Sequence, residues 1–179
     1  QTEEKPKQET GTTPKGKIIF QSSRDENYNL YTIKADGSGL SRFTDTEANE
    51  TSPKWSPDGT KVAFVSDISG NLDIFVANSD STGFTPLTSG EDKEINPVWS
   101  PDGTEIAYVK NENEIHVKSS LGGDSTLLYS SPSKLGDLCW GSDGVITAVS
   151  FKGEGLETKL VVLNKDGSLS SFGANEGAT

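Results

Sequence analysis

The sequence predicts an all-β fold, a β-propeller of about four blades with four antiparallel strands in each blade. Three observations lead to this prediction. A unit of 41 to 44 residues recurs along the chain, Asp–Gly turns recur at matching places, and short runs of β-branched and aromatic residues lie between the turns. No run has the length or the 3.6-residue period of a helix, so we expect almost no helix. Four blades form either a closed small ring or an open arc.

Residues 1–15 differ from the rest of the chain because they contain no aromatic residue, Val, Ile or Leu. Such a stretch buries too little apolar surface to offset the entropy of ordering it, so we expect a disordered tether. It is similar to the linker that follows a lipidated cysteine in bacterial lipoproteins, which implies a lipid anchor upstream. An ordinary frayed terminus is the alternative interpretation.

The repeat begins after this tether and is clearest in its first three units. The segment Gly59–Phe64 aligns with Gly103–Tyr108 at an offset of 44 residues, and the same offset relates Trp55 to Trp99. Trp140 follows 41 residues later, in a fourth unit that keeps the tryptophan but loses the proline after it. We expect the propeller repeats to fill residues 16–179, with units at about 16–54, 55–98, 99–139 and 140–179.

Strand signals occur at four places in the repeating unit. The runs are 17–20, 62–64 and 106–108; then 30–33, 74–76 and 115–117; then 40–43, 84–87 and 126–129; and finally 53–55, 97–99 and 138–140. The turns Ser56–Gly59 and Ser100–Gly103 share the sequence Ser–Pro–Asp–Gly, in which Pro presets the turn angle and Gly accepts a positive φ. The first unit lacks a strand before Ile18, which residues 173–179 either supply or leave missing.

Composition excludes several functional classes. The 179 residues include 16 Lys and Arg against 27 Asp and Glu, a formal net charge of −11, whereas nucleic-acid binders carry a basic surface. No apolar run approaches the roughly 20 residues of a membrane span. One cysteine supports neither a metal–thiolate cluster nor a disulfide scaffold. We therefore expect no nucleic-acid partner and no membrane span.

Three segments carry a more specific resemblance. Asn96–Tyr108, Asp73–Asn78 and Ala35–Leu40 resemble the repeat of the TolB-type, WD-like β-propellers. That family occurs in periplasmic and surface proteins of bacteria and in the noncatalytic propellers of some serine peptidases. The resemblance implies the propeller fold, a generic binding role and an extracytoplasmic location, periplasmic or at the cell surface. It transfers no catalytic residue, because the repeated motif is architectural.

The three tryptophans recur at one position of the unit, so we expect Trp55, Trp99 and Trp140 to pack blade against blade, as in other repeat stacks. An aromatic ring for sugars or peptides is the alternative. His116 takes the place of Tyr31 and Phe75, which favours packing over a metal site, since zinc or manganese recruits further His or Cys ligands.

Cys139 directly precedes the last tryptophan. We expect a buried, inert thiol, because a free cysteine usually packs as a small hydrophobe. A nucleophilic role needs an adjacent base, and the only histidine is predicted to lie in a neighbouring blade.

The acidic residues form the most informative polar pattern. Glu50 and Glu94 each lie five residues before a tryptophan, where the chain enters the innermost strand of its blade. We expect both carboxylates to point at one mouth of the central channel, with Asp137 nearby. Together they are candidates for binding a cation or a basic peptide. The alternative is that each caps a local loop or pairs with Lys54 or Lys93.

These observations favour a non-catalytic, extracytoplasmic binding or scaffold module that recognises a protein or peptide. We predict no catalytic residue, no metal ligand and no cofactor. The alternative is a propeller lyase or hydrolase that acts on a glycan at the channel mouth. A sensor ectodomain without a small ligand is a third interpretation. A closed ring implies a monomer, whereas an open arc with exposed edge strands implies an edge-paired dimer. A fragment of a longer propeller is the remaining interpretation.

Overall fold

The computed structural model describes residues 16–152, 157–164 and 166–169, and every regular element within them is a β-strand. The all-β prediction is confirmed. The tether expected at residues 1–15 and the strand considered at 173–179 lie outside the described residues.

Fourteen strands form four antiparallel sheets, here called blades 1 to 4, in which strands adjacent in sequence pair with each other. Blade 1 contains β1 (Lys17–Asp25), β2 (Asn27–Lys34) and β3 (Ser41–Arg42). Blade 2 contains β4 (Glu50–Trp55), β5 (Lys61–Ser66), β6 (Asp73–Asn78) and β7 (Thr85–Pro86). Blade 3 contains β8 (Glu94–Trp99), β9 (Glu105–Lys110), β10 (Glu114–Ser119) and β11 (Ser125–Ser130). Blade 4 contains β12 (Lys134–Trp140), β13 (Ile146–Lys152) and β14 (Glu157–Leu163).

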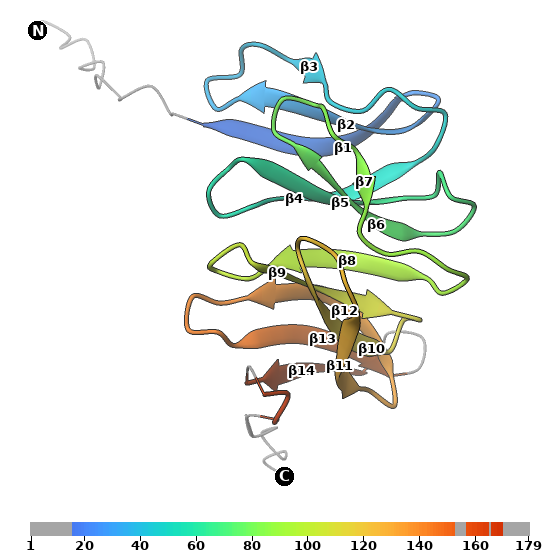
Figure 1. Cartoon of the computed structure of the whole chain (residues 1–179), viewed down its shortest axis with the longest axis vertical. Coiled ribbons are helices and arrows are strands. Elements are labelled where there is room, and N and C mark those ends of the chain that lie inside the picture. Colours follow the sequence, from blue (N-terminus) through green and yellow to red (C-terminus); the bar gives the residue numbers. More distant parts are fainter. Residues whose placement is uncertain (1–15, 153–156, 165, 170–179) are drawn as a thin grey trace, which may run out of the picture.

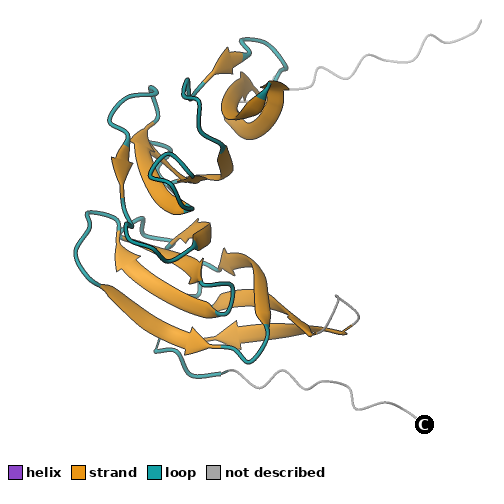
Figure 2. Cartoon of the chain, turned by 90° about the vertical axis from the view of Figure 1, so that its right-hand side faces the viewer, coloured by secondary structure: helices purple, strands orange, loops and turns teal. Residues whose placement is uncertain are grey.

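The blades follow one another along the molecule (Figure 1) and form an open arc whose two end blades lie apart (Figure 2). Strand β1 contacts β4, β4 contacts β8, and β8 contacts β12, so these four strands line the inside of the arc. Of the two architectures left open by the sequence, the structure has the arc. Blade 1 starts at β1, the counterpart of β5, and has no described strand that corresponds to β4.

Each blade is buried on both faces where it has a neighbour on both sides. In β5, Val62 and Phe64 point toward blade 1, whereas Ala63 and Val65 point toward blade 3. All four side chains are at most 2% exposed. We call the side toward the preceding blade the front face and the side toward the following blade the rear face. Three apolar clusters fill the three interfaces between blades, which explains why the strand runs are apolar without alternation.

The Ser–Pro–Asp–Gly turns close the hairpins between the first two strands of blades 2 and 3. The Asp58 carboxylate accepts hydrogen bonds from the Ser56 hydroxyl at 2.6 Å and from the Thr60 amide at 3.0 Å. These bonds lower the pKa of Asp58 to about 2. Gly59 has a φ of +70°, which a residue with a Cβ adopts only under strain. The turn therefore requires both the carboxylate and the glycine.

The tryptophans occupy corresponding places in successive blades. Each is the last residue of the first strand of blades 2, 3 and 4. These sheets therefore begin five or six residues before the tryptophan, whereas the repeat units were counted from the tryptophan itself. Trp55 packs between blades 1 and 2, and Trp140 packs between blades 3 and 4. Trp99 is 7% exposed, and its indole nitrogen donates a hydrogen bond of 3.0 Å to the Lys54 carbonyl in blade 2. The rings serve packing between blades, as expected.

A second aromatic motif recurs across the first three blades. Pairs of rings stack between neighbouring strands with centroids 5.9–6.0 Å apart; they are Phe20 with Tyr31, Phe64 with Phe75, and Tyr108 with His116. His116 thus packs where Tyr and Phe pack in the other blades, and its Nε2 atom lies 3.0 Å from the Glu114 carboxylate.

The prediction of a buried thiol at Cys139 is wrong, because this residue is exposed. Cys139 is the counterpart of Val98, which is covered by blade 4. No following blade among the described residues covers the rear face of blade 4, so the same position is open there.

Replacement of Trp99 by Ala is expected to lower the free energy of unfolding by about 3–5 kcal/mol, because it removes a buried ring and leaves a cavity between blades 2 and 3. Urea unfolding followed by fluorescence measures the loss. The control is Leu121→Ala, at a side chain that is 90% exposed, for which we expect a change within about 0.5 kcal/mol. Equal stability of Trp99→Ala and the wild type would contradict the packing role.

Candidate binding groove on the inside of the arc

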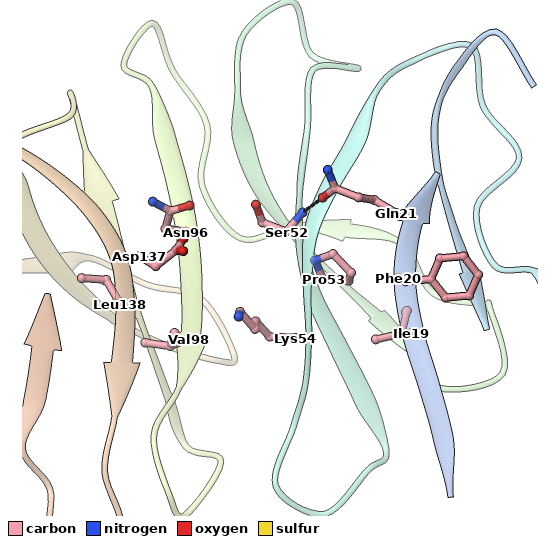
Figure 3. A pocket seen from close by; sticks show the side chains of 10 residues that line it. All are labelled: Ile19, Phe20, Gln21, Ser52, Pro53, Lys54, Asn96, Val98, Asp137 and Leu138. Atoms are coloured by element: carbon pink, nitrogen blue, oxygen red, sulfur yellow. Dashed lines mark hydrogen bonds between the residues drawn. The ribbon is translucent and has the colours of Figure 1, made fainter. Parts of the chain in front are cut away.

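The four inner strands border a groove with a volume of about 300 Å³ (Figure 3). It is lined by Ile19, Phe20 and Gln21 of β1, by Ser52, Pro53 and Lys54 of β4, by Asn96 and Val98 of β8, and by Asp137 and Leu138 of β12. Each blade thus contributes to one continuous surface along the inside of the arc. Five of these ten residues are polar and five are apolar, so the groove is more polar than most small-molecule pockets.

A repeated β-bulge places the polar side chains in the groove. The register of pairing shifts between Thr51 and Lys54, between Ile95 and Val98, and between Leu135 and Leu138; these are the shifts of β4, β8 and β12. Ser52 and Asn96 occupy the same position of their bulges, and both have a left-handed backbone, with φ of 53° and 55°. Asp137 lies in the corresponding bulge of blade 4. Strained backbone at equivalent positions is a feature that often accompanies a binding function.

The bulges also accommodate the prolines that follow them. Pro53 and Pro97 have no N–H to donate to the strand ladder, and a bulge removes the need for one. In β4 and β8 a polar residue is followed by a proline and, two residues later, by the tryptophan. This order of residues therefore indicates a bulged inner strand in blades 2 and 3.

The groove offers unpaired polar groups of both signs. The Ser52 amide donates a hydrogen bond of 2.8 Å to the Gln21 side-chain oxygen, which links blade 1 to blade 2. Within the described part of the chain, the Asn96 amide, the Asp137 carboxylate and the Lys54 ammonium form no hydrogen bond or ion pair with other side chains. These three groups are free to bind a ligand.

Of the three candidates from the sequence, the structure places only Asp137 in the groove. Glu50 and Glu94 are 1% and 3% exposed and lie away from it, at the start of β4 and β8. Glu50 accepts hydrogen bonds from the hydroxyls of Thr46 and Ser66, and Glu94 lies 3.9 Å from the Lys110 ammonium. Both residues precede the bulge, are buried, and are not among the residues that line the groove.

The ion pairs considered for these two carboxylates do not form among the described residues. Neither Glu50 nor Glu94 pairs with Lys54 or Lys93 there, and the Lys93 ammonium lies 2.8 Å from the Glu112 carboxylate instead. The alternative also allowed each carboxylate to cap a local loop. Glu50 does accept hydrogen bonds from nearby hydroxyls, those of Thr46 and Ser66.

The sequence reasoning missed Gln21, Ser52, Asn96 and Lys54. A signal for two of them was present, because Ser52 and Asn96 align in the repeat. No pattern marks Gln21 or Lys54, which enter the groove through contacts between different blades.

Glu94 belongs to a buried polar cluster between blades 2 and 3. Burial raises the pKa of Glu94 to about 7, and the nearby Asp73 carboxyl adds to the rise, whereas the Thr88 hydroxyl and the Lys110 ammonium oppose it. Asp73 is 1% exposed, and one oxygen of Glu94 is buried without a hydrogen-bond partner among the described residues. Glu94 therefore holds its proton in the folded protein at a pH where the unfolded chain has lost it.

This difference predicts that stability falls as the pH rises from about 4.5 to 7, because the folded state binds the proton more tightly than the unfolded state. Replacement of Glu94 by Gln removes this group's share of the slope, about 2 kcal/mol across the window. Urea unfolding at several pH values measures it. Glu47→Gln, at an exposed carboxylate, is the matched control and is expected to leave the slope unchanged. A slope that persists in Glu94→Gln would contradict the assignment.

The family model of the TolB β-propeller domain matches residues 12–177. The chain belongs to the TolB β-propeller family. A protein of Agrobacterium tumefaciens described as TolB superposes with a TM-score of 0.76 at 18% identity, over 86% of this chain and 60% of that one. An oligogalacturonate lyase of Vibrio parahaemolyticus superposes with a TM-score of 0.59 at 18% identity, over 87% of this chain and 46% of that one. At these identities the likeness shows the fold alone.

Dipeptidyl-peptidase 5 of Porphyromonas gingivalis is 50% identical over 34 residues, which make up 19% of this chain and 5% of that protein. The chain thus spans 60% or less of each of these three proteins. In the described residues, no group of three or more His, Cys, Asp or Glu is arranged to hold a metal ion. No helix in the described part of the chain is suited to crossing a membrane.

Proposed function

We propose that this chain is a non-catalytic, extracytoplasmic binding module that holds an extended segment of a protein or peptide in the groove inside the arc. The observation that carries this proposal is the repeated bulge, which presents Ser52, Asn96 and Asp137 from three successive blades to one surface. The chain's membership of the TolB family supports the extracytoplasmic location and a protein partner.

The chemistry of the groove suits a peptide. An extended chain exposes backbone N–H and C=O groups at every residue, and the Asn96 amide both donates and accepts hydrogen bonds. The Asp137 carboxylate accepts bonds from an ammonium or guanidinium, and the apolar side chains of Ile19, Val98 and Leu138 provide contact area. A volume of about 300 Å³ is at the small end of ligand pockets, which fits a short segment.

Charge favours a basic partner. The net charge of −11 attracts cationic segments from a distance and accelerates their encounter with the groove. At the groove itself, Asp137 is the acidic group that remains free to pair, while Lys54 favours an acidic or carbonyl group elsewhere on the same peptide. The partner expected from this arrangement is an unstructured segment that carries at least one Lys or Arg.

The test measures the binding of fluorescent twelve-residue peptides of basic, neutral and acidic composition by anisotropy. The wild type is expected to prefer the basic peptide. Asp137→Asn is expected to weaken that binding about 10-fold or more, because a charge-assisted hydrogen bond contributes about 1.5–3 kcal/mol. Asp124→Asn changes the net charge equally at an exposed residue outside the groove, and it is expected to change affinity less than about 2-fold, since a single distant surface charge is largely screened by salt.

Equal loss of affinity in the two variants would show that long-range charge, and not the groove, binds the peptide. Absence of peptide binding to the wild type would reject the proposal. Cleavage of polygalacturonate by the chain, with or without added manganese, would favour the lyase alternative over a non-catalytic module.

A further inference from the structure

A second pocket, with a volume of about 210 Å³, lies between blades 1 and 2 and shares no residue with the groove. Strands β1 and β2 line one side, and the turn between β6 and β7 lines the other. Most of the polar side chains in its wall carry an ammonium or a hydroxyl group; they include Lys17, Thr32, Lys34, Ser79 and Ser81.

The two lysines of this pocket lie directly opposite each other. Lys17 of β1 pairs in register with Lys34 of β2. Side chains at such positions share one face of the sheet, with Cβ atoms about 5 Å apart, and like charges there destabilise the pairing. The corresponding pairs of blades 2 and 3 are Lys61 with Asn78 and Glu105 with Ser119, which avoid this repulsion. Blade 1 therefore departs from the repeat at a cost in stability, and it does so inside a pocket.

The turn that follows β2 supports one of these lysines. Gly39 has a φ of +67°, and a Cβ added to it would lie 3.3 Å from the Cε atom of Lys34. The glycine thus leaves room for the aliphatic part of Lys34 to lie close against the turn. Within the described part of the chain, neither Lys17 nor Lys34 forms an ion pair.

Blade 2 contributes hydroxyl groups from the opposite side. Ser79 and Ser81 are both half-buried, and their hydroxyls have no hydrogen-bond partner among the described residues. Ser81 has a left-handed backbone with a φ of 68°, a strained conformation for a residue that carries a Cβ. The pocket thus combines two ammonium groups with two hydroxyls that are free to donate.

Two carboxylates lie near the lysines, and each is engaged within its own turn. Asp80, in the wall of the pocket, accepts hydrogen bonds from the Thr82 amide at 3.1 Å and the Thr82 hydroxyl at 2.6 Å. Asp36 accepts bonds from the Ser38 amide and hydroxyl at 2.9 and 2.7 Å. These bonds lower the pKa of Asp36, and the charge of Lys34 adds to the effect. Neither carboxylate forms an ion pair with the two lysines.

We propose that this pocket binds a tetrahedral oxyanion, the phosphate or sulfate group of a small monoester. The anion relieves the repulsion between Lys17 and Lys34, since ammonium groups bind such anions as point charges. Its remaining oxygens accept hydrogen bonds from Ser79 and Ser81. The volume corresponds to about seven water molecules at roughly 30 Å³ each, which is more than a bare oxyanion fills. The organic part of the ester then lies against Ile33 in the same wall. This inference is independent of the proposed peptide binding.

The test is isothermal titration calorimetry at low ionic strength with phenyl phosphate, phenyl sulfate and phenol. The wild type is expected to bind both esters and not phenol. Lys17→Gln and Lys34→Gln are each expected to weaken ester binding about 10-fold or more, because a hydrogen bond to a charged group is lost. Lys61→Gln is the matched control. It removes the same charge from the position in blade 2 that corresponds to Lys17, and the affinity is expected to change less than about 2-fold.

Thermal unfolding without ligand separates binding from folding. Lys17→Gln and Lys34→Gln are expected to melt at a temperature no lower than that of the wild type, because each removes a like-charge contact. Sedimentation with vesicles that contain phosphatidic acid compares a lipid source of the phosphate group with the soluble esters. Failure of the wild type to bind either ester, binding to the vesicles alone, or an equal loss of affinity in Lys61→Gln would each overturn the proposal.

Discussion

The packing of one apolar sheet face on the next is the interaction on which this structure depends. A blade of three or four short strands has no core of its own, and it becomes stable only when neighbours cover its faces. Blades 2 and 3 meet this requirement on both sides, so β5, β6 and β9 each contain a run of four buried apolar residues. The tryptophans and stacked ring pairs recur where blades meet. Within the described residues, the end blades are covered by a neighbour on one side, and Ile18 and Leu160 are 52% and 60% exposed on the other.

The same packing creates the groove. Since the blades stack along an arc, their inner strands converge on one side, and a feature repeated in each strand becomes a row of equivalent groups. The bulges at Ser52 and Asn96 interrupt the strand ladder and turn polar side chains away from the sheets. A concave surface thus arises from the repeat itself, and its polar character varies from blade to blade through the differences between Ser52, Asn96 and Asp137.

Buried polar groups lie among the otherwise apolar contacts between blades. Glu50 and Glu94 each have one buried oxygen without a partner among the described residues, and Glu94 shares its surroundings with Asp73. Such groups cost stability when they are ionised, so they do not explain why the blades associate. The Thr44 and Thr88 hydroxyls, which accept hydrogen bonds from the amides of Leu30 and Ile74, satisfy backbone groups that the short outer strands leave free.

The repeat period was enough to predict the all-β class, the blades, the packing of the tryptophans and the aromatic position of His116, because each of these follows from a spacing along the chain. The family resemblance rested on the same repeated segments. The open arc, the exposure of Cys139, and the presence of Asp137 but not Glu50 or Glu94 in the groove became clear only in three dimensions. The reason is physical: a period along the chain specifies which face of a strand a residue occupies, whereas its exposure and its partners depend on whether another blade lies against that face.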